Sequence, residues 1–173
     1  MNEIETLQSQ ARDLYGTLEQ PEKALALLLR ALELDKNNVE TLNLLAAVYY
    51  ELDDIETAED FHGNALDVCP NSVEALHGLA ALANERGDHT QALKLTKFAL
   101  DAAPLDPSTE FRENADYRQR LLAQVYIERA TALWQQGNPA DAHHILTITA
   151  PTACPLEEET FAEELEWLEE GAE

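Results

Sequence analysis

The amino-acid sequence predicts an all-α protein, an α-solenoid of about four helix pairs with a C-terminal acidic capping helix. The first observation behind this prediction is a repeated octet: ALELDKNN, ALDVCPNS and ALDAAPLD begin at Ala31, Ala65 and Ala99, 34 residues apart. The second is that apolar residues recur at helical spacing within each segment and are interrupted once near its middle. A fixed period of this length indicates repeats that bury their apolar faces only by stacking on their neighbours.

The two central repeats, residues 39–72 and 73–106, are the most regular. In each, an apolar helical pattern is broken by a short polar stretch, ELDD in one and RGD in the other, and then resumes. Gly87 is predicted to supply a left-handed C-cap at the second break. Pro70 and Pro104 end the second helices, because proline lacks an N–H donor and clashes with the preceding turn. Each repeat is therefore predicted to be helix, turn, helix.

The outer repeats are less regular. One is predicted at about residues 5–38 and one at residues 123–155, where QQGN supplies the turn, so the solenoid spans residues 1–155. Residues 156–173 are acidic, with three apolar side chains on one helical face. These are Phe161, Leu165 and Leu168. We expect this segment to cover the last repeat; the alternative, favoured by Trp167 beside the apolar face, is a helix that docks on a partner or inhibits the protein itself.

Extra residues separate the third repeat from the fourth. They occupy residues 107–122 and begin after Asp106, which can cap a helix whose first turn holds Pro107. We predict an elongated helix running towards Gln136, with a possible break at Asn114 because ENAD is a weak helix former. The extension either lengthens a binding surface or is a packing irregularity that adjusts the superhelical pitch.

The charge restricts the partners. The chain has 34 acidic and 11 basic residues, a formal net charge of −23, and no Lys or Arg between Lys36 and Arg86 or after Arg129. Such a field repels phosphate backbones and anionic lipids and attracts basic proteins. We therefore expect a protein partner, with no nucleic acid and no membrane, and leave the oligomeric state open. The start, MNEIETLQSQ, lacks the features of a signal peptide, which predicts a cytoplasmic protein.

No pattern typical of catalysis or of cofactor or metal binding is present. Cys69 and Cys154 are too few for a disulfide framework and are predicted to be reduced, and the histidines form no H-x-x-x-H pair. The sequence also lacks a glycine-rich phosphate loop and a G-x-S-x-G motif. We therefore expect that the protein is not an enzyme and that it has no catalytic residue, no cofactor and no metal.

The repeats resemble the tetratricopeptide repeat, a 34-residue helix pair with small residues at positions 8, 20 and 27 and proline at position 32. The matching residues are Ala46, Ala58, Ala65 and Pro70 in the second repeat and Ala80, Ala92, Ala99 and Pro104 in the third. The first repeat keeps Ala24 and Ala31 but has Lys36 in place of proline, and the fourth is recognisable from Ala130 and Ala142. The resemblance implies a protein-binding solenoid.

The resemblance further implies that the first helix of each pair lines a concave groove. The candidate peptide-binding residues are Asn43, Leu44, Tyr50, Glu51, His77, Asn84, Glu85, Ile127 and Trp134. Glu128 and Thr131 also fall at groove positions. In the last three repeats these positions carry no Lys or Arg, and residues such as Leu44, Glu74 and Gly78 cannot form the cationic clamp with which some family members hold chaperone tails.

Two functions follow from these expectations. The first is a non-enzymatic protein-interaction module that binds a basic or polar protein segment in an acidic concave groove. The alternative is a dedicated chaperone for one basic or aggregation-prone client, similar to small acidic tetratricopeptide proteins that serve type III secretion.

Overall fold

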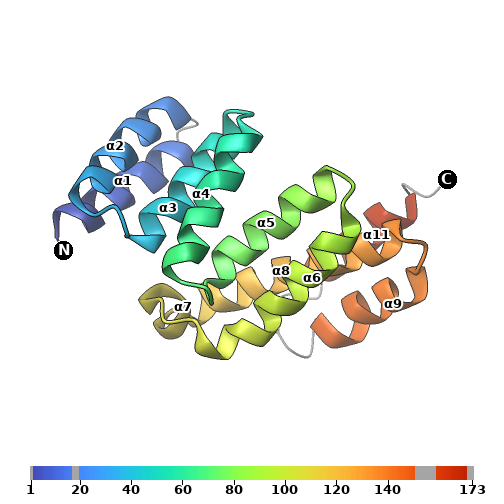
Figure 1. The fold of residues 1–173 in the computed structure, drawn as a ribbon. Helices are drawn as coiled ribbons and strands as arrows, with labels where there is room; N and C mark the ends of the chain where they lie inside the picture. Colours follow the sequence, from blue (N-terminus) through green and yellow to red (C-terminus); the bar gives the residue numbers. More distant parts are fainter. Residues whose placement is uncertain (1, 17–19, 151–158, 171–173) are drawn as a thin grey trace. The chain divides into compact units, whose positions relative to one another are not determined.

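The computed structural model describes residues 2–16, 20–150 and 159–170, and the regular structure in these ranges is helical (Figure 1). The helices form the four predicted pairs. They are α1 (Glu3–Gly16) with α2 (Pro21–Leu34), α3 (Val39–Glu51) with α4 (Ile55–Val68), α5 (Val73–Glu85) with α6 (His89–Ala102), and α8 (Ala115–Gln135) with α9 (Pro139–His144) and the π-helical turn η2 (Ile145–Thr149). The chain divides into an N-terminal part, Met1–Pro70, and a C-terminal part, Asn71–Glu173.

Local hydrogen bonds explain where the helices begin. At the start of α3, α4, α5, α6, α8 and α9, a side-chain oxygen accepts the backbone N–H three residues further on. The capping residues are Asn38, Asp54, Ser72, Asp88, Asn114 and Asn138. Each satisfies an amide that has no partner within its own helix, which stabilises the helix by about 1 kcal/mol. The boundaries of each pair are therefore encoded by residues beside them.

The small repeat positions lie in the core, as predicted. Ten alanines at these positions have no exposed surface. They are Ala24, Ala31, Ala46, Ala58, Ala65, Ala80, Ala92, Ala99, Ala130 and Ala142. A side chain of one carbon allows neighbouring helices to approach closely, and a larger residue there would overpack the interface at a cost of about 1–3 kcal/mol. The 34-residue period thus coincides with small side chains that are fully buried in the core.

The turn between the helices of a pair has one geometry in three repeats. The chain enters the left-handed region at Asp53 (φ 61°), Gly87 (φ 77°) and Gly137 (φ 78°). At each turn this residue's N–H donates to a carbonyl three residues back, and the next N–H donates to one five residues back, at 2.8–2.9 Å. This pattern is a Schellman-type helix end. The left-handed C-cap predicted at Gly87 is confirmed.

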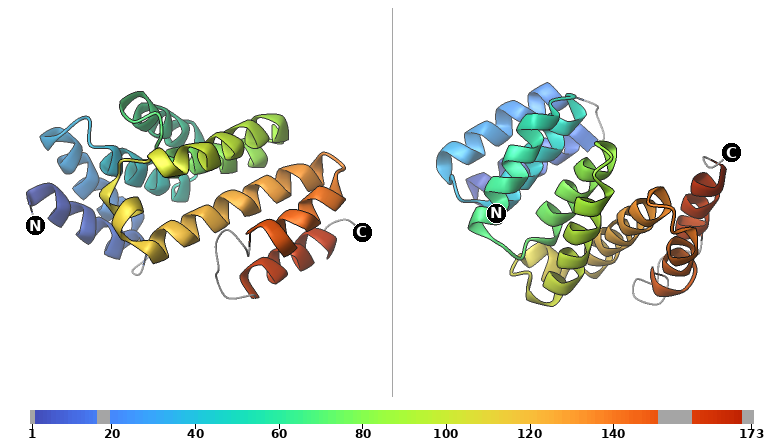
Figure 2. Two further views of the ribbon diagram at one scale, coloured as in Figure 1. Left: turned by 90° about the horizontal axis from the view of Figure 1, so that it is seen from below. Right: turned by 45° about the vertical axis from the view of Figure 1, so that its right-hand side comes forward.

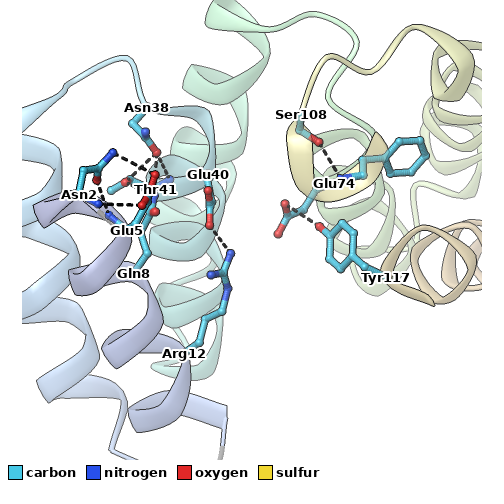
Figure 3. A network of polar contacts seen from close by, with 11 residues as sticks. Asn2, Glu5, Gln8, Arg12, Asn38, Glu40, Thr41, Glu74, Ser108 and Tyr117 are labelled. Carbon is cyan, nitrogen blue, oxygen red and sulfur yellow. Dashed lines mark hydrogen bonds and ion pairs between the residues drawn. The ribbon is translucent and has the colours of Figure 1, made fainter. Parts of the chain in front are cut away.

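A buried polar contact organises the N-terminal part. Gln8 of α1 is buried, and its Nε2 donates to Asn38 Oδ1 at 2.8 Å and to Thr41 Oγ1 at 2.9 Å (Figure 3). Asn38 Oδ1 also accepts the N–H of Thr41 in the first turn of α3. Gln8 therefore joins α1 to the beginning of α3, while Leu28, Leu45 and neighbouring apolar residues form the core beside it.

The extra residues form two helices with a break between them. The short helix α7 (Thr109–Glu113) ends before Asn114, whose Oδ1 accepts the N–H of Tyr117 at 3.0 Å and caps the long helix α8. The break at Asn114, left open by the sequence, is therefore present, and Figure 2 shows α8 as one long helix after it.

Asp106 has a different role from the predicted helix cap. After α6 the chain makes a 3₁₀ turn, η1 (Ala103–Leu105), which contains Pro104. Asp106 Oδ2 then accepts the N–H of Val73 at 2.8 Å, and Asp106 Oδ1 accepts the N–H of Ser108 at 2.8 Å. The buried carboxylate thus supports the first turn of α5, and Ser108 Oγ accepts the Phe111 N–H in α7 (Figure 3).

The last helix, α11 (Glu159–Glu170), packs on the fourth pair through the predicted apolar face. Phe161 and Leu168 are each 3% exposed and lie in one core cluster with Leu146 of η2, against which Leu165 also packs. Figure 2 shows α11 beside the C-terminal end of α8. Trp167, in contrast, is 60% exposed. Residues 151–158 lie outside the described ranges, and with them Cys154 and the start of the predicted capping segment.

Candidate functional site

The nine residues predicted for the groove fall into two sets, one in each part of the chain. Asn43, Leu44, Tyr50 and Glu51 belong to α3 in the N-terminal part, and His77, Asn84, Glu85, Ile127 and Trp134 belong to α5 and α8 in the C-terminal part. Each set is defined by the contacts within its own part of the chain.

The predicted residues of α3 that are exposed lie at its C-terminal end. Asn43 is 1% exposed, and its Oδ1 lies 3.2 Å from Nδ1 of the buried His62 on α4. Leu44 is 6% exposed and belongs to the apolar core. The sequence places both at the groove surface, and the structure instead buries them because α3 packs against α2 as well as α4. Tyr50, 41% exposed, and the exposed Glu51 remain as surface residues.

The first helix also contributes a cation that the sequence analysis did not identify. Arg12 of α1 forms an ion pair with Glu40 of α3 (Figure 3). This pair neutralises a carboxylate near the start of α3, whereas Tyr50 and Glu51 lie at the other end of that helix. The register of the first repeat is the least regular, so spacing alone gave no signal for Arg12.

In the C-terminal part, Asn84 links three helices. Its Nδ2 donates to the backbone oxygen of Glu128 at 2.9 Å and to Glu128 Oε2 at 2.7 Å, which connects α5 to α8. Its Oδ1 lies 3.2 Å from Nδ1 of His89 at the start of α6. Asn84 therefore holds the Glu128 side chain in place rather than presenting a free amide.

Glu128 on α8 interacts electrostatically with one glutamate on each of two other helices; we call Glu85, Glu128 and Glu164 the carboxylate cluster. Burial raises the pKa of Glu128, the Asn84 hydrogen bond opposes this effect, and the negative charges of Glu164 and Glu85 raise the pKa further. Burial likewise raises the pKa of Glu164, opposed by a hydrogen bond with Thr131. Because Glu85 lies on α5, Glu128 on α8 and Glu164 on α11, their proximity is produced by the tertiary fold.

The carboxylate cluster is electronegative but is not arranged as a metal site. Among the described residues, no three acidic, histidine or cysteine side chains are grouped to hold a metal ion. A carboxylate that is partly buried beside like charges is stabilised by a nearby cation, since the interaction is stronger away from bulk water.

The other residues of the C-terminal set lie on α5 and α8, the helices that also carry Glu85 and Glu128. Burial lowers the pKa of the half-buried His77 to about 4, so its ring is neutral at physiological pH and adds no positive charge. Tyr117 Oη donates to Glu74 Oε2 at 3.0 Å, so the extra residues of α8 contact the first turn of α5 (Figure 3). Ile127 and Trp134 are half-buried and pack against the core cluster that contains Phe161.

Family models match three parts of the chain. Three models, each described as tetratricopeptide repeat, match residues 5–38, residues 27–60, and residues 73–95 with 122–146. The stacked helix pairs define the class, an α-solenoid with the architecture of a protein-interaction scaffold. The chain belongs to the tetratricopeptide-repeat family.

Solved structures share this fold at low sequence identity. PilF of Pseudomonas aeruginosa is 15% identical with a TM-score of 0.76, and the match covers 96% of this chain and 67% of that one. A MamA structure is 17% identical with a TM-score of 0.63, covering 86% and 72%. MamA from Desulfovibrio magneticus RS-1 is 20% identical with a TM-score of 0.53, covering 98% and 95%. These identities show the fold alone.

No curated protein sequence matches the chain. Within the described ranges, no helix combines the length and apolar character needed to cross a bilayer.

Proposed function

We propose that this protein is an interaction module that binds a Lys- or Arg-containing segment of a protein partner, with the carboxylate cluster as the charged contact. The observation that supports the proposal is the convergence of Glu85, Glu128 and Glu164 from three helices, where burial and mutual repulsion raise the pKa of Glu128. Bringing like charges together disfavours their ionised form. A cationic side chain placed between them offsets that unfavourable term on binding.

Aromatic and polar side chains supply the remaining contacts in this proposal. Aromatic residues are common anchors of protein interfaces, because they bury a large area at a small cost in side-chain entropy. The residues retained from the sequence prediction form two separate sets, Tyr50 and Glu51 on α3, and His77, Asn84, Glu85, Ile127 and Trp134 on α5 and α8. Asn43 and Leu44 are left out because they are core residues. Tyr50 belongs to the α3 set, and replacing it by alanine should weaken binding of a partner to that set by at least about 1 kcal/mol.

The charges also predict how binding depends on salt and pH. A field set by a net charge of −23 accelerates the approach of a cationic segment, and salt screens this effect. A cation interacts with the ionised carboxylates, so affinity should fall as the pH drops through the raised pKa of Glu128. An acidic segment should bind weakly at every pH.

Short peptides test the proposal directly. We would measure the binding of a lysine-rich peptide, a twin with glutamate in place of lysine, and a neutral glutamine twin by fluorescence anisotropy. The informative variants are Glu164→Gln and its matched control Glu163→Gln, which removes the same charge from an exposed neighbour on α11. We expect Glu164→Gln to weaken binding of the lysine-rich peptide about fivefold or more and Glu163→Gln to have a small effect. Equal effects, or equal binding of the acidic twin, would show that the carboxylate cluster is not the contact.

A further inference from the structure

A cavity lies in the N-terminal part between the second helices of the first two pairs. Its volume is about 530 Å³, within the roughly 300–1,000 Å³ of ligand-binding clefts. Residues from the C-terminal halves of α2 and α4 form its walls, and Leu42 of α3 also lines it. We call this cavity the α2–α4 groove. It uses neither the carboxylate cluster nor Tyr50, so binding in this groove is independent of the function proposed above.

The floor of the α2–α4 groove is apolar and well supported. Leu42 is buried, and Leu32 and Phe61 are half-buried. The Phe61 ring stacks on Tyr49 of α3, with ring centroids 5.4 Å apart and an interplanar angle of 12°. An aromatic ring held in this way presents a fixed surface, so a ligand does not have to order the floor when it binds.

The rim of the groove exposes more apolar surface. Leu29 on α2 is 40% exposed and Val68 on α4 is 43% exposed, and both line the same cavity. Single exposed leucines and valines are ordinary on protein surfaces. Two of them flanking an apolar floor form a continuous surface that gains free energy when it is covered, at roughly 25 cal/mol per Å² of apolar area.

One end of the groove is electronegative. Glu33 on α2 and Asp67 on α4 both line it within the last turns of their helices. Neither last turn contains a basic residue, so the partial negative charges of two helix C-termini add to the two carboxylates. Among the described lining residues Lys36 is the one cation. This end favours a positively charged group.

We propose that the α2–α4 groove is a second protein-binding surface, which takes a partner segment that has two apolar side chains flanked by Lys or Arg. The apolar side chains cover the floor and the rim at Leu29 and Val68, and the basic residue lies beside Glu33 and Asp67. Charge complementarity favours this occupant over a second copy of the chain, because two molecules that each carry a net charge of −23 repel one another.

A random-peptide library displayed on phage tests the proposal with the full-length chain. Selection is made on the wild-type protein, after removal of phage that bind the double variant Leu29→Glu/Val68→Glu. We expect the recovered peptides to share two apolar residues with adjacent Lys or Arg, and their synthetic versions to lose at least about tenfold in affinity with the double variant. Both substituted residues are at least 40% exposed, and circular dichroism and thermal unfolding verify that the variant folds.

Two further variants make the outcome specific. Leu105→Glu changes an exposed leucine of η1, 66% exposed, and should leave binding unchanged. The charge reversal Glu33→Lys/Asp67→Lys should weaken binding of the recovered peptides and strengthen binding of versions with Glu in place of Lys or Arg. Glu164→Gln should have little effect, which separates this surface from the carboxylate cluster.

Three results would overturn the proposal: recovery of no peptide that depends on Leu29 and Val68, recovery of peptides without basic residues, or concentration-dependent dimers of the wild type that the double variant abolishes. The last result would identify a second copy of the chain as the occupant.

Discussion

The three equivalent turns allow a quantitative test of the repeat geometry. Asp53, Gly87 and Gly137 occupy the same place between the helices of three pairs, and all have positive φ. An L-residue in the left-handed region has about 1–2 kcal/mol of backbone strain that glycine avoids. Replacing Gly87 or Gly137 by alanine introduces this strain, while the added Cβ at either position meets nothing within 4 Å. The predicted effect is therefore one of backbone conformation alone.

The net magnitude includes the unfolded chain. Alanine restricts the conformations of the unfolded chain more than glycine does, and this effect raises the free energy of unfolding by about 0.4–1 kcal/mol. We therefore expect Gly87→Ala and Gly137→Ala each to lower the free energy of unfolding by about 1 kcal/mol. Asp53 already has the unfavourable φ, although aspartate tolerates it better than most residues. Asp53→Gly should therefore raise the free energy of unfolding, by up to about 1 kcal/mol.

Urea unfolding followed by circular dichroism measures all three changes in otherwise identical proteins. Hydrogen exchange should locate the loss for Gly87→Ala in the adjoining ends of α5 and α6, because the turn hydrogen bonds to Asn84 and Ala83 open first. A neutral Gly87→Ala variant together with a destabilised Asp53→Gly variant would refute the assignment of a common left-handed turn.

Three other predictions concern the C-terminal part. Phe161→Ala should remove about 3–5 kcal/mol of packing and release α11, seen as lost hydrogen-exchange protection in that helix; unchanged protection would show that α11 does not depend on this contact. The second prediction concerns pH. Because the pKa of Glu128 is raised, the folded state binds the Glu128 proton more tightly than the unfolded state does, and the contribution of Glu128 to stability falls as pH rises above about 4.5. Glu128→Gln should therefore be more stable than wild type at neutral pH but not at low pH. His77 acts in the opposite sense: its lowered pKa makes stability fall as pH drops from 6.5 to about 4, so His77→Gln should flatten the unfolding profile in that range, and an unaltered profile would contradict the burial of this ring.

Features that depend on local spacing were predictable from the sequence. The 34-residue period and the alanines at its small positions predicted the helix pairs, because the periodicity of a helix determines which of its residues face inward. Gly87 predicted its turn, because only glycine adopts positive φ without strain. Phe161, Leu165 and Leu168 predicted the buried face of α11 for the same reason as the alanines.

Features that depend on neighbouring helices were not predictable from the sequence. The resemblance assigned Asn43 and Leu44 to the groove by repeat position, but how much of α3 is covered depends on the helices around it, and Thr41 to Ala46 are all buried. Glu164 joins Glu128 only because of where α11 docks. The α2–α4 groove likewise depends on the separation of two helices, which no local pattern records.

Two opposing effects act on the docking of helix α11 at neutral pH, burial of apolar surface and repulsion between carboxylates. Together they predict that docking of α11 is coupled to peptide binding. Phe161 and Leu168 favour docking by burying apolar surface, whereas docking brings Glu164 close to Glu128 and opposes it. In the proposed function, a basic segment that contacts both carboxylates removes this repulsion, so it binds the docked state better than the undocked state. A ligand with such a preference must stabilise docking by the same free energy that docking adds to its affinity. A saturating concentration of lysine-rich peptide should therefore slow hydrogen exchange in α11, and Phe161→Ala should weaken the binding of that peptide. Exchange in α11 that is unaffected by bound peptide would show that the helix only caps the solenoid.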